Sequence, residues 1–196
     1  QTTSLAADNL LAVAGDIVIT SGTFAPGAAT LEVGGNWTKN GGTFTVGTST
    51  VTFNGGASKA INGTTASQTF NNITTSGSST SITMSGSTTT VTAAALTVGA
   101  SSTFTALSAG TLNLTGTLTI TGTFVAPGST GTFNLSGNFV DNGVFTHNSG
   151  TLIMKAAGAQ SVSGTENPIV FNNLTVNTTG TALTISSPNT TNLIGS

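Results

Sequence analysis

The sequence predicts an all-β fold, a parallel β-helix (β-solenoid) made of two repeats of about 101 residues. Three observations support this prediction. Only 4% of the 196 residues are charged, so the polarity of the chain comes from Thr, Ser, Asn and Gly. Short runs of alternating apolar residues recur along the chain, as in strands with one buried face. When the sequence is aligned with itself at a fixed offset, one half matches the other, which is typical of solenoids.

The repeat is defined by pairs of segments that align at an offset of about 101 residues. They are residues 10–20 with 111–121, 22–33 with 122–135, 34–56 with 136–158, 69–75 with 170–176, and 81–85 with 182–186. The matched positions are alternating apolar residues and the Gly, Asn and Pro between them, which determine the fold. We therefore expect a first repeat over residues 1–105 and a second over residues 106–196, in one continuous elongated domain.

The expected strands follow one another closely along each repeat. The Ala-rich residues 4–15 are interpreted as the opening turn, because they align with the strand-like residues 106–114. Later strands are centred on paired apolar residues, namely Leu31 and Val33, Phe44 and Val46, Val51 and Phe53, Ile82 and Met84, and Leu118 and Ile120. Each pair places two apolar side chains on one face of a brief strand. Asn-Gly pairs at residues 40–41, 54–55, 62–63 and 142–143 are expected at corners, because both residue types tolerate positive φ.

Two architectures accommodate many short strands with frequent turns. One is a series of tandem β-sandwich domains, and the other is a parallel β-helix. We favour the solenoid, because outward-facing Thr, Ser and Asn can stack into ladders along its axis, where a low content of charge is tolerated. With roughly 20 residues per turn, one repeat would form about five turns.

The segment GGNWTKNGGTFTVGTSTVTFNGG, residues 34–56, followed by QTFNNITT from Gln68, carries a family resemblance. It resembles the repeats of large secreted and surface-attached bacterial proteins, of the filamentous-haemagglutinin type and other β-helical adhesins. The resemblance covers both copies of the repeat. It implies a role in surface structure or adhesion and transfers no catalytic residue.

The charge and hydropathy of the chain exclude several classes of partner. Three Lys, no Arg and five acidic residues give a formal net charge of -2, which offers no basic surface to nucleic acid or to an anionic membrane. No apolar run approaches the roughly 20 residues that span a bilayer. We expect no nucleic-acid partner and no membrane insertion. Because the chain begins at Gln1, we expect a secreted protein, extracellular or at the cell surface, whose signal peptide was removed before this residue.

Few side chains could carry out chemistry. The titratable residues are Asp8, Asp16, Glu32, Asp141, Glu166, Lys39, Lys59, Lys155 and His147. β-Helical lyases and hydrolases use clusters of carboxylates with Arg or Lys, but no two acidic residues here are close in sequence. Stacking of the repeats could still bring Glu32 near Asp141. His147 aligns with Val46, and the three Lys align with unlike residues, so we interpret all four as solvated surface residues. We expect no enzyme activity, no catalytic residue, no cofactor and no metal.

Two residue patterns have both a structural and a binding interpretation. Trp37 aligns with Phe139, and this recurrence favours packing in the core over a platform for stacking sugars. Alternating Thr residues suggest ice binding, because flat threonine arrays on solenoids can order water. They occur at Thr117, Thr119, Thr121 and Thr123. Such arrays need the same pattern on successive turns, and Ile153 in the second copy aligns with Thr52, so we rank ice binding below a structural role.

Eight Asn-x-Ser/Thr triplets are candidate glycosylation sites, because glycans would make an almost uncharged surface more soluble. They begin at Asn36, Asn62, Asn72, Asn113, Asn134, Asn173, Asn177 and Asn189.

The function expected from these features is self-assembly. The terminal turns of a solenoid expose strand edges and a cross-section of the core, and the sequence shows no charged or helical cap at either end. We expect copies of the chain to join head to tail, or by exchange of a terminal strand, into an extracellular filament or sheath. The alternative is a stalk or binding module of a larger surface adhesin, with glycans or a host or neighbouring cell surface as partner. An ice-binding protein is the less favoured third alternative.

Overall fold

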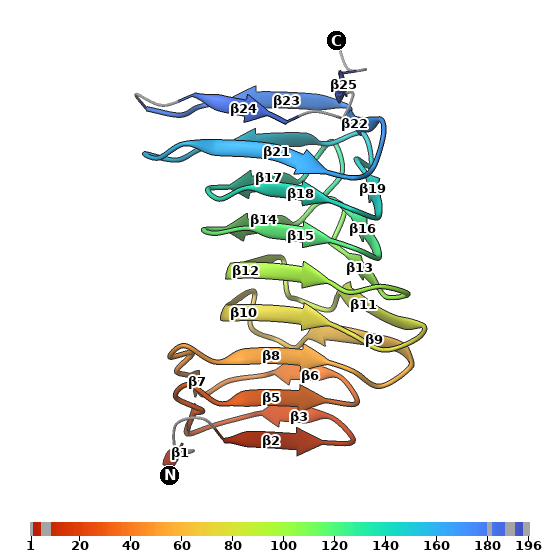
Figure 1. Ribbon diagram of the computed structural model, residues 1–196. Coiled ribbons are helices and arrows are strands. Elements are labelled where there is room, and N and C mark those ends of the chain that lie inside the picture. Colours follow the sequence, from red (N-terminus) through yellow and green to blue (C-terminus); the bar gives the residue numbers. More distant parts are fainter. Residues whose placement is uncertain (1, 5–8, 180–181, 187–190, 194–196) are drawn as a thin grey trace.

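The computed structural model describes residues 2–4, 9–179, 182–186 and 191–193. Every regular element in this part of the chain is a strand, and the strands pair in parallel. They wind into a solenoid of about 8 turns, which rises in Figure 1 from the first strands at the bottom to the last at the top. The predicted parallel β-helix is confirmed. The alternative of tandem β-sandwich domains is wrong, because those domains pair their strands antiparallel.

Each turn contributes one strand to each of three faces. Face 1 contains β2 (Leu10–Val13), β5 (Thr30–Val33), β8 (Thr50–Phe53), the second halves of β10 (Ser67–Thr75) and β12 (Thr90–Val98), β15 (Leu118–Ile120), β18 (Phe139–Asp141), β21 (Gln160–Gly164) and β24 (Leu183–Ile185). Face 2 contains β3 (Ile17–Ile19), β6 (Trp37–Lys39), β9 (Ala57–Asn62), β11 (Thr80–Met84), β13 (Thr103–Thr105), β16 (Thr123–Val125), β19 (Val144–Thr146), β22 (Ile169–Phe171) and β25 (Thr191–Leu193). Face 3 contains β1 (Thr2–Ser4), β4 (Thr23–Ala25), β7 (Thr43–Phe44), the first halves of β10 and β12, β14 (Thr111–Leu114), β17 (Thr132–Leu135), β20 (Thr151–Met154) and β23 (Asn173–Val176).

The hydrophobic core runs along the axis inside the three faces. In β5, for example, Leu31 and Val33 point inward and are fully buried, whereas Thr30 and Glu32 point outward. Leu31 pairs with Val51 of the next turn, 20 residues further on. Because inward residues pair with inward residues in successive turns, the alternation that predicted single strands also produces a continuous core.

Two clusters of three aromatic rings lie in this core. In the first, Trp37 packs edge-on against Phe44 and Phe70, with ring centroids 4.7 and 5.2 Å apart. In the second, Phe139 packs edge-on against Phe145 and Phe171, at 5.0 and 5.2 Å. Their members correspond one to one in the sequence repeat. The expectation that Trp37 packs in the core is confirmed, since its side chain is fully buried.

The sequence repeat does not contain a whole number of turns. β2 of the first repeat corresponds to β14 of the second, and the strands from β2 to β13 fill fourteen positions, because β10 and β12 each bend across two faces. With three positions per turn, one repeat spans four and two-thirds turns. This number agrees with the expectation of about five turns. Because it is not whole, equivalent residues of the two repeats lie on different faces.

Glycines at the corners serve two distinct physical needs. Gly63 and its equivalent Gly164 have φ values of +131° and +133°, in a region that other residues avoid. Gly41 has no such φ, but a Cβ there would collide with the Thr20 carbonyl oxygen of the preceding turn. Of the four Asn-Gly corners expected to use positive φ, only the one at Gly63 does so. At Gly41, Gly55 and Gly143 a Cβ would instead meet a carbonyl oxygen of the preceding turn, so close approach between turns explains these glycines.

Candidate functional site

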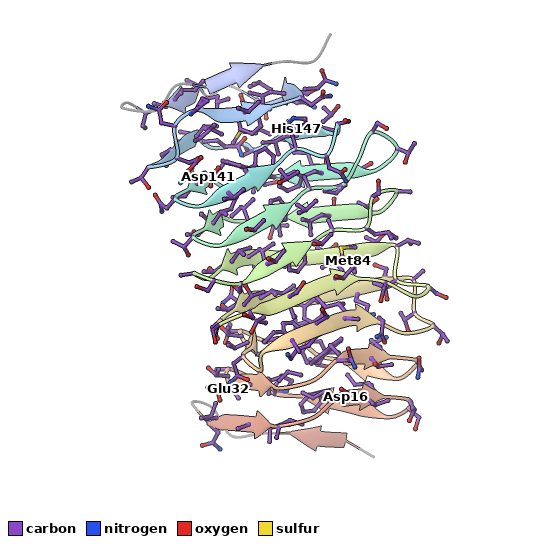
Figure 2. All side chains as sticks on the ribbon, turned by 90° about the vertical axis from the view of Figure 1, so that its right-hand side faces the viewer. Asp16, Glu32, Met84, Asp141 and His147 are labelled. Carbon is purple, nitrogen blue, oxygen red and sulfur yellow. The ribbon has the colours of Figure 1, made fainter. Side chains whose placement is uncertain are left out.

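The titratable side chains that the structure describes are dispersed along the solenoid; Asp8 lies outside the described residues. Figure 2 shows Asp16 and Glu32 near the first turns and Asp141 and His147 near the last. Glu32 pairs across turns with Thr52, whereas Asp141 pairs with Ile120 and Gly164. The structure therefore does not bring Glu32 near Asp141: both lie on face 1, but β8, β10, β12 and β15 stack between β5 and β18.

Asp141 is the most perturbed titratable group in the described part of the chain. It ends β18 on face 1 and is fully buried. Its Oδ1 accepts a hydrogen bond from the Gly143 amide at 3.2 Å, and its Oδ2 has no protein partner. Burial raises the pKa of Asp141 to about 6; the negative charge of Glu166 adds to the rise and the Gly143 hydrogen bond opposes it. A carboxyl enclosed in this way has no access to a substrate.

Lys59 was expected at the solvated surface, and this expectation is wrong. Its side chain is only 6% exposed, and its Nζ donates to the carbonyl oxygens of Gly56 and Ala57, at 2.7 and 3.3 Å. The stem is covered while the charged end reaches the corner carbonyls. Burial lowers the pKa of Lys59. Its equivalent, Gln160, is also buried, and its Nε2 donates to two carbonyl oxygens of the preceding turn.

His147 lies in the corner that follows β19. Its Nδ1 accepts a hydrogen bond from the Ser149 amide at 3.0 Å, so it stabilises the corner. Among the described residues, no group of three His, Cys, Asp or Glu side chains is placed to hold a metal ion.

The candidate glycosylation sites fall into groups by the contacts of their side chains. The amide nitrogens of Asn36, Asn72, Asn113 and Asn134 donate to side-chain oxygens of the preceding turn. Asn62 and Asn173 are half-buried, Asn177 is exposed, and Asn189 lies outside the described residues. Attachment of a glycan at the first four sites would disturb contacts between turns, so Asn177 is the most accessible acceptor among the seven described sites.

The last described turn leaves core positions uncovered. Val176 and Ile185 pair with the buried Met154 and Val162, so they point inward, yet their side chains are 49% and 48% exposed. Their equivalents in the first repeat, Thr75 and Met84, are 0% and 1% exposed. There the second half of β12 covers β10, and β13 covers β11. No described strand covers β23 or β24 in this way.

The first described turn is open in the same sense. Leu11, Ile17 and Phe24 line a hollow of about 480 Å³ and are only partly buried. Their partners in the next turn include Leu31 and Trp37, which are fully buried. These two ends, which we call the first-turn end and the last-turn end, form the candidate functional site. The sequence predicted uncapped ends but did not identify the residues that form them. Val176 aligns with Thr75, which β12 covers in the first repeat, and this alignment was the signal that could have identified Val176.

Comparison with known protein families, with curated proteins and with solved structures gave no match. The fold and the two ends define the chain as a three-faced parallel β-solenoid with an internal repeat. The resemblance to bacterial adhesin repeats stays a prediction. No helix in the described residues is long and apolar enough to cross a membrane.

Proposed function

We propose that this chain is an extracellular structural protein whose copies stack head to tail into a filament or sheath. The observation that carries the proposal is the last-turn end, where Val176 and Ile185 are half exposed although their equivalents in the first repeat are buried. A second copy stacked on this end would cover both side chains. Burial of such apolar surface favours association by roughly 25 cal/mol per Å².

The two ends match in the direction of their strands and in the order in which the strands occupy the three faces. All strands run parallel, so the first turn of one copy can extend the sheets of the last turn of another without reversal. The last turn places β24 on face 1 and β25 on face 2, and the first described strand, β1, lies on face 3. In the proposed contact, β1 of the next copy takes the face 3 position beyond β23. This contact joins unlike surfaces, so it propagates into a filament.

The alternative is a stalk or binding module of a larger surface adhesin, with glycans or a host or neighbouring cell surface as partner. The same uncovered residues favour it equally, because a further turn of the same polypeptide would bury Val176 and Ile185. An extracellular location belongs to both versions.

Electron microscopy of the purified chain at near-neutral pH tests the proposal. We expect filaments, and we expect Val176→Lys to abolish them, because the Lys side chain would place a charge in the buried contact. Thr175→Lys is the matched control: Thr175 is exposed on the same strand but points outward, so this variant should still assemble. Circular dichroism establishes that both variants remain folded.

Short monodisperse rods from the wild-type chain would contradict self-assembly and support the adhesin module. Filaments that persist in Val176→Lys would place the contact elsewhere on the molecule.

We further propose that, in a host that glycosylates Asn-x-Ser/Thr triplets, Asn177 is modified first. Mass spectrometry of peptides from the secreted protein tests this order, which rests on the exposure of Asn177 and on the hydrogen bonds of Asn36, Asn72, Asn113 and Asn134.

A further inference from the structure

Face 3 carries two rows of outward-facing polar side chains over six successive turns, from β10 to β23. We call these rows the face 3 lattice. The first row consists of Ser67, Thr90, Thr111, Thr132, Thr151 and Asn173, and the second of Thr69, Thr92, Asn113, Asn134, Ile153 and Thr175. The residue between the two rows points inward on each strand, as with the buried Val91, Leu112 and Phe133. Eleven of the twelve positions hold a hydroxyl or an amide.

The spacing of the face 3 lattice is set by β geometry. Neighbouring positions within a strand are two residues apart, about 6.6–6.8 Å, and positions in successive turns are about 4.7–4.9 Å apart. Because the pairing is in register across the face, both distances repeat. A rectangular grid of these dimensions is close to the oxygen spacings on the faces of an ice crystal.

The polar groups of this lattice are held in place by contacts between turns. Asn134 donates through Nδ2 to Oδ1 of Asn113 at 2.7 Å, and Asn113 donates through Nδ2 to Oγ1 of Thr92 at 3.4 Å. The Thr side chains are β-branched, which restricts χ1. Most of the lattice residues are half-buried against their neighbours. The surface therefore presents its hydroxyls and amides in fixed positions, so little side-chain entropy remains to be lost on binding.

The chemistry of the face 3 lattice favours an uncharged partner that forms hydrogen bonds with hydroxyl groups. No lattice position holds a charged residue, so no attraction to an ionic partner is available there. None holds an aromatic residue either, and the rings of Trp37, Phe104 and Phe124 are buried in the core. Recognition of polysaccharides commonly relies on exposed aromatic rings, which this face lacks.

From these observations we propose that the face 3 lattice binds ice. The sequence argued against a regular array of threonines because Thr52 aligns with Ile153. In the structure Thr52 lies on face 1 and Ile153 on face 3, so the two residues do not belong to the same array. In the actual stack only Ile153 interrupts the two rows. Face 1 provides a poorer surface, because its outward rows include Glu32, Ala95 and Val140. This inference is independent of whether copies of the chain assemble.

Thermal hysteresis and inhibition of ice recrystallisation test the proposal, with unglycosylated protein as the probe. We expect the wild-type chain to show both effects and Thr111→Tyr to lose most of them, because the ring would stand above the centre of the lattice. The matched control is Thr105→Tyr, at an outward position of β13 on face 2, which should retain the wild-type activity. Ile153→Thr, which completes the second row, should increase the hysteresis.

Three results would overturn the proposal. The wild-type chain could lack thermal hysteresis and recrystallisation inhibition. Thr111→Tyr and Thr105→Tyr, both shown to be folded by circular dichroism, could reduce activity equally. The wild-type chain could bind crystalline cellulose or chitin, with Thr111→Tyr abolishing that binding, while it has no effect on ice; this would assign the face 3 lattice to a polysaccharide.

Discussion

The two repeats build the same aromatic cluster in different polar surroundings. In the first repeat, Nε1 of Trp37 donates to Oε1 of Gln68 at 3.0 Å inside the core. In the second, the equivalent positions hold Phe139 and Ile169, which have no polar group to satisfy. The indole and the amide occur together and are replaced together. The comparison teaches that packing positions are shared between the repeats, whereas the buried indole N–H is present only together with the amide that accepts its hydrogen bond.

The corners give a second comparison between the repeats. The Asn36 Oδ1 accepts a hydrogen bond from the Ala60 amide at 2.9 Å, and the Asn138 Oδ1 accepts one from the Ser161 amide at the same distance. The repeats differ at the position two residues after Trp37 in the first repeat and after Phe139 in the second. This position holds Lys39 in the first repeat and the buried Asp141 in the second. Backbone geometry is therefore the shared part of the design, and charge is the variable part.

The largest expected effect tests the shared geometry. Gly63→Ala and Gly164→Ala should each lower the free energy of unfolding by at least about 3 kcal/mol, because both residues have strained positive φ values and both Cβ atoms would meet backbone of the preceding turn. Urea denaturation followed by circular dichroism measures the change. The control is Gly15→Ala, since nothing lies within 4 Å of a Cβ built there.

Unequal losses in the free energy of unfolding for Gly63→Ala and Gly164→Ala would contradict the view that the two repeats share one corner geometry. They would mean that the two repeats differ in how far the corner can relax, although their glycines share one conformation.

The second prediction concerns the charge on which the repeats differ. The ordinary pKa of Asp is near 3.9, and that of Asp141 is about 6, so the folded state holds the proton more tightly than the unfolded state. The contribution of Asp141 to stability is therefore most favourable below about pH 4, and it declines as the pH rises to about 6. Asp141→Asn should remove this loss and stabilise the protein by about 3 kcal/mol at neutral pH, with little effect at low pH.

Urea denaturation of this variant and the wild type across the pH range measures the effect. Lys39→Gln, at the equivalent position of the first repeat, is the control and should change stability by less than about 0.5 kcal/mol. A gain from Asp141→Asn that is the same at low and neutral pH would show that the carboxyl has the same pKa in the folded and unfolded states, contrary to this prediction.

The sequence predicted the class of the fold but not how its parts stack. Alternation at Leu31 and Val33, or at Leu118 and Ile120, is a local signal, and four of the five expected pairs are buried. The exception is Phe44 and Val46, which are only partly buried. Stacking depends on the number of residues in each corner, and that number varies from turn to turn. The offset of about 101 residues therefore conceals a step between paired residues of successive turns that ranges from 19 to 24. For this reason the sequence left open whether Glu32 lies near Asp141, and it did not reveal the face 3 lattice.

The burial of single polar side chains was equally hard to predict. Lys59 occupies an inward position of β9, but its ammonium reaches corner carbonyls whose positions depend on the fold. Asp141 follows the inward Phe139 by two residues, so alternation placed it inside, but nothing in its sequence neighbourhood identified the lack of a partner for Oδ2. The open last turn was visible in outline from the sequence, and its residues required the register of β23 and β24.

The smallest expected effect tests whether the indole and the amide form one unit. Gln68→Ile alone leaves the indole N–H unpaired and also removes the bond from Gln68 Nε2 to Oγ1 of Thr88, so it should cost about 1–3 kcal/mol. Trp37→Phe alone leaves Oε1 of Gln68 without its donor. The double variant carries the pair found in the second repeat, and its cost should fall below the sum of the two single costs by about 1 kcal/mol.

A double-mutant cycle from urea denaturation measures this coupling. Trp37→Phe combined with Ile120→Val, a core position several turns away, is the matched cycle and should be additive to within about 0.5 kcal/mol. Additive costs in the Trp37 and Gln68 cycle would mean that the two repeats acquired their polar and apolar versions independently. The coupled result would instead explain why the second repeat lacks both groups: once one partner is lost, the other is a buried polar group that destabilises the fold.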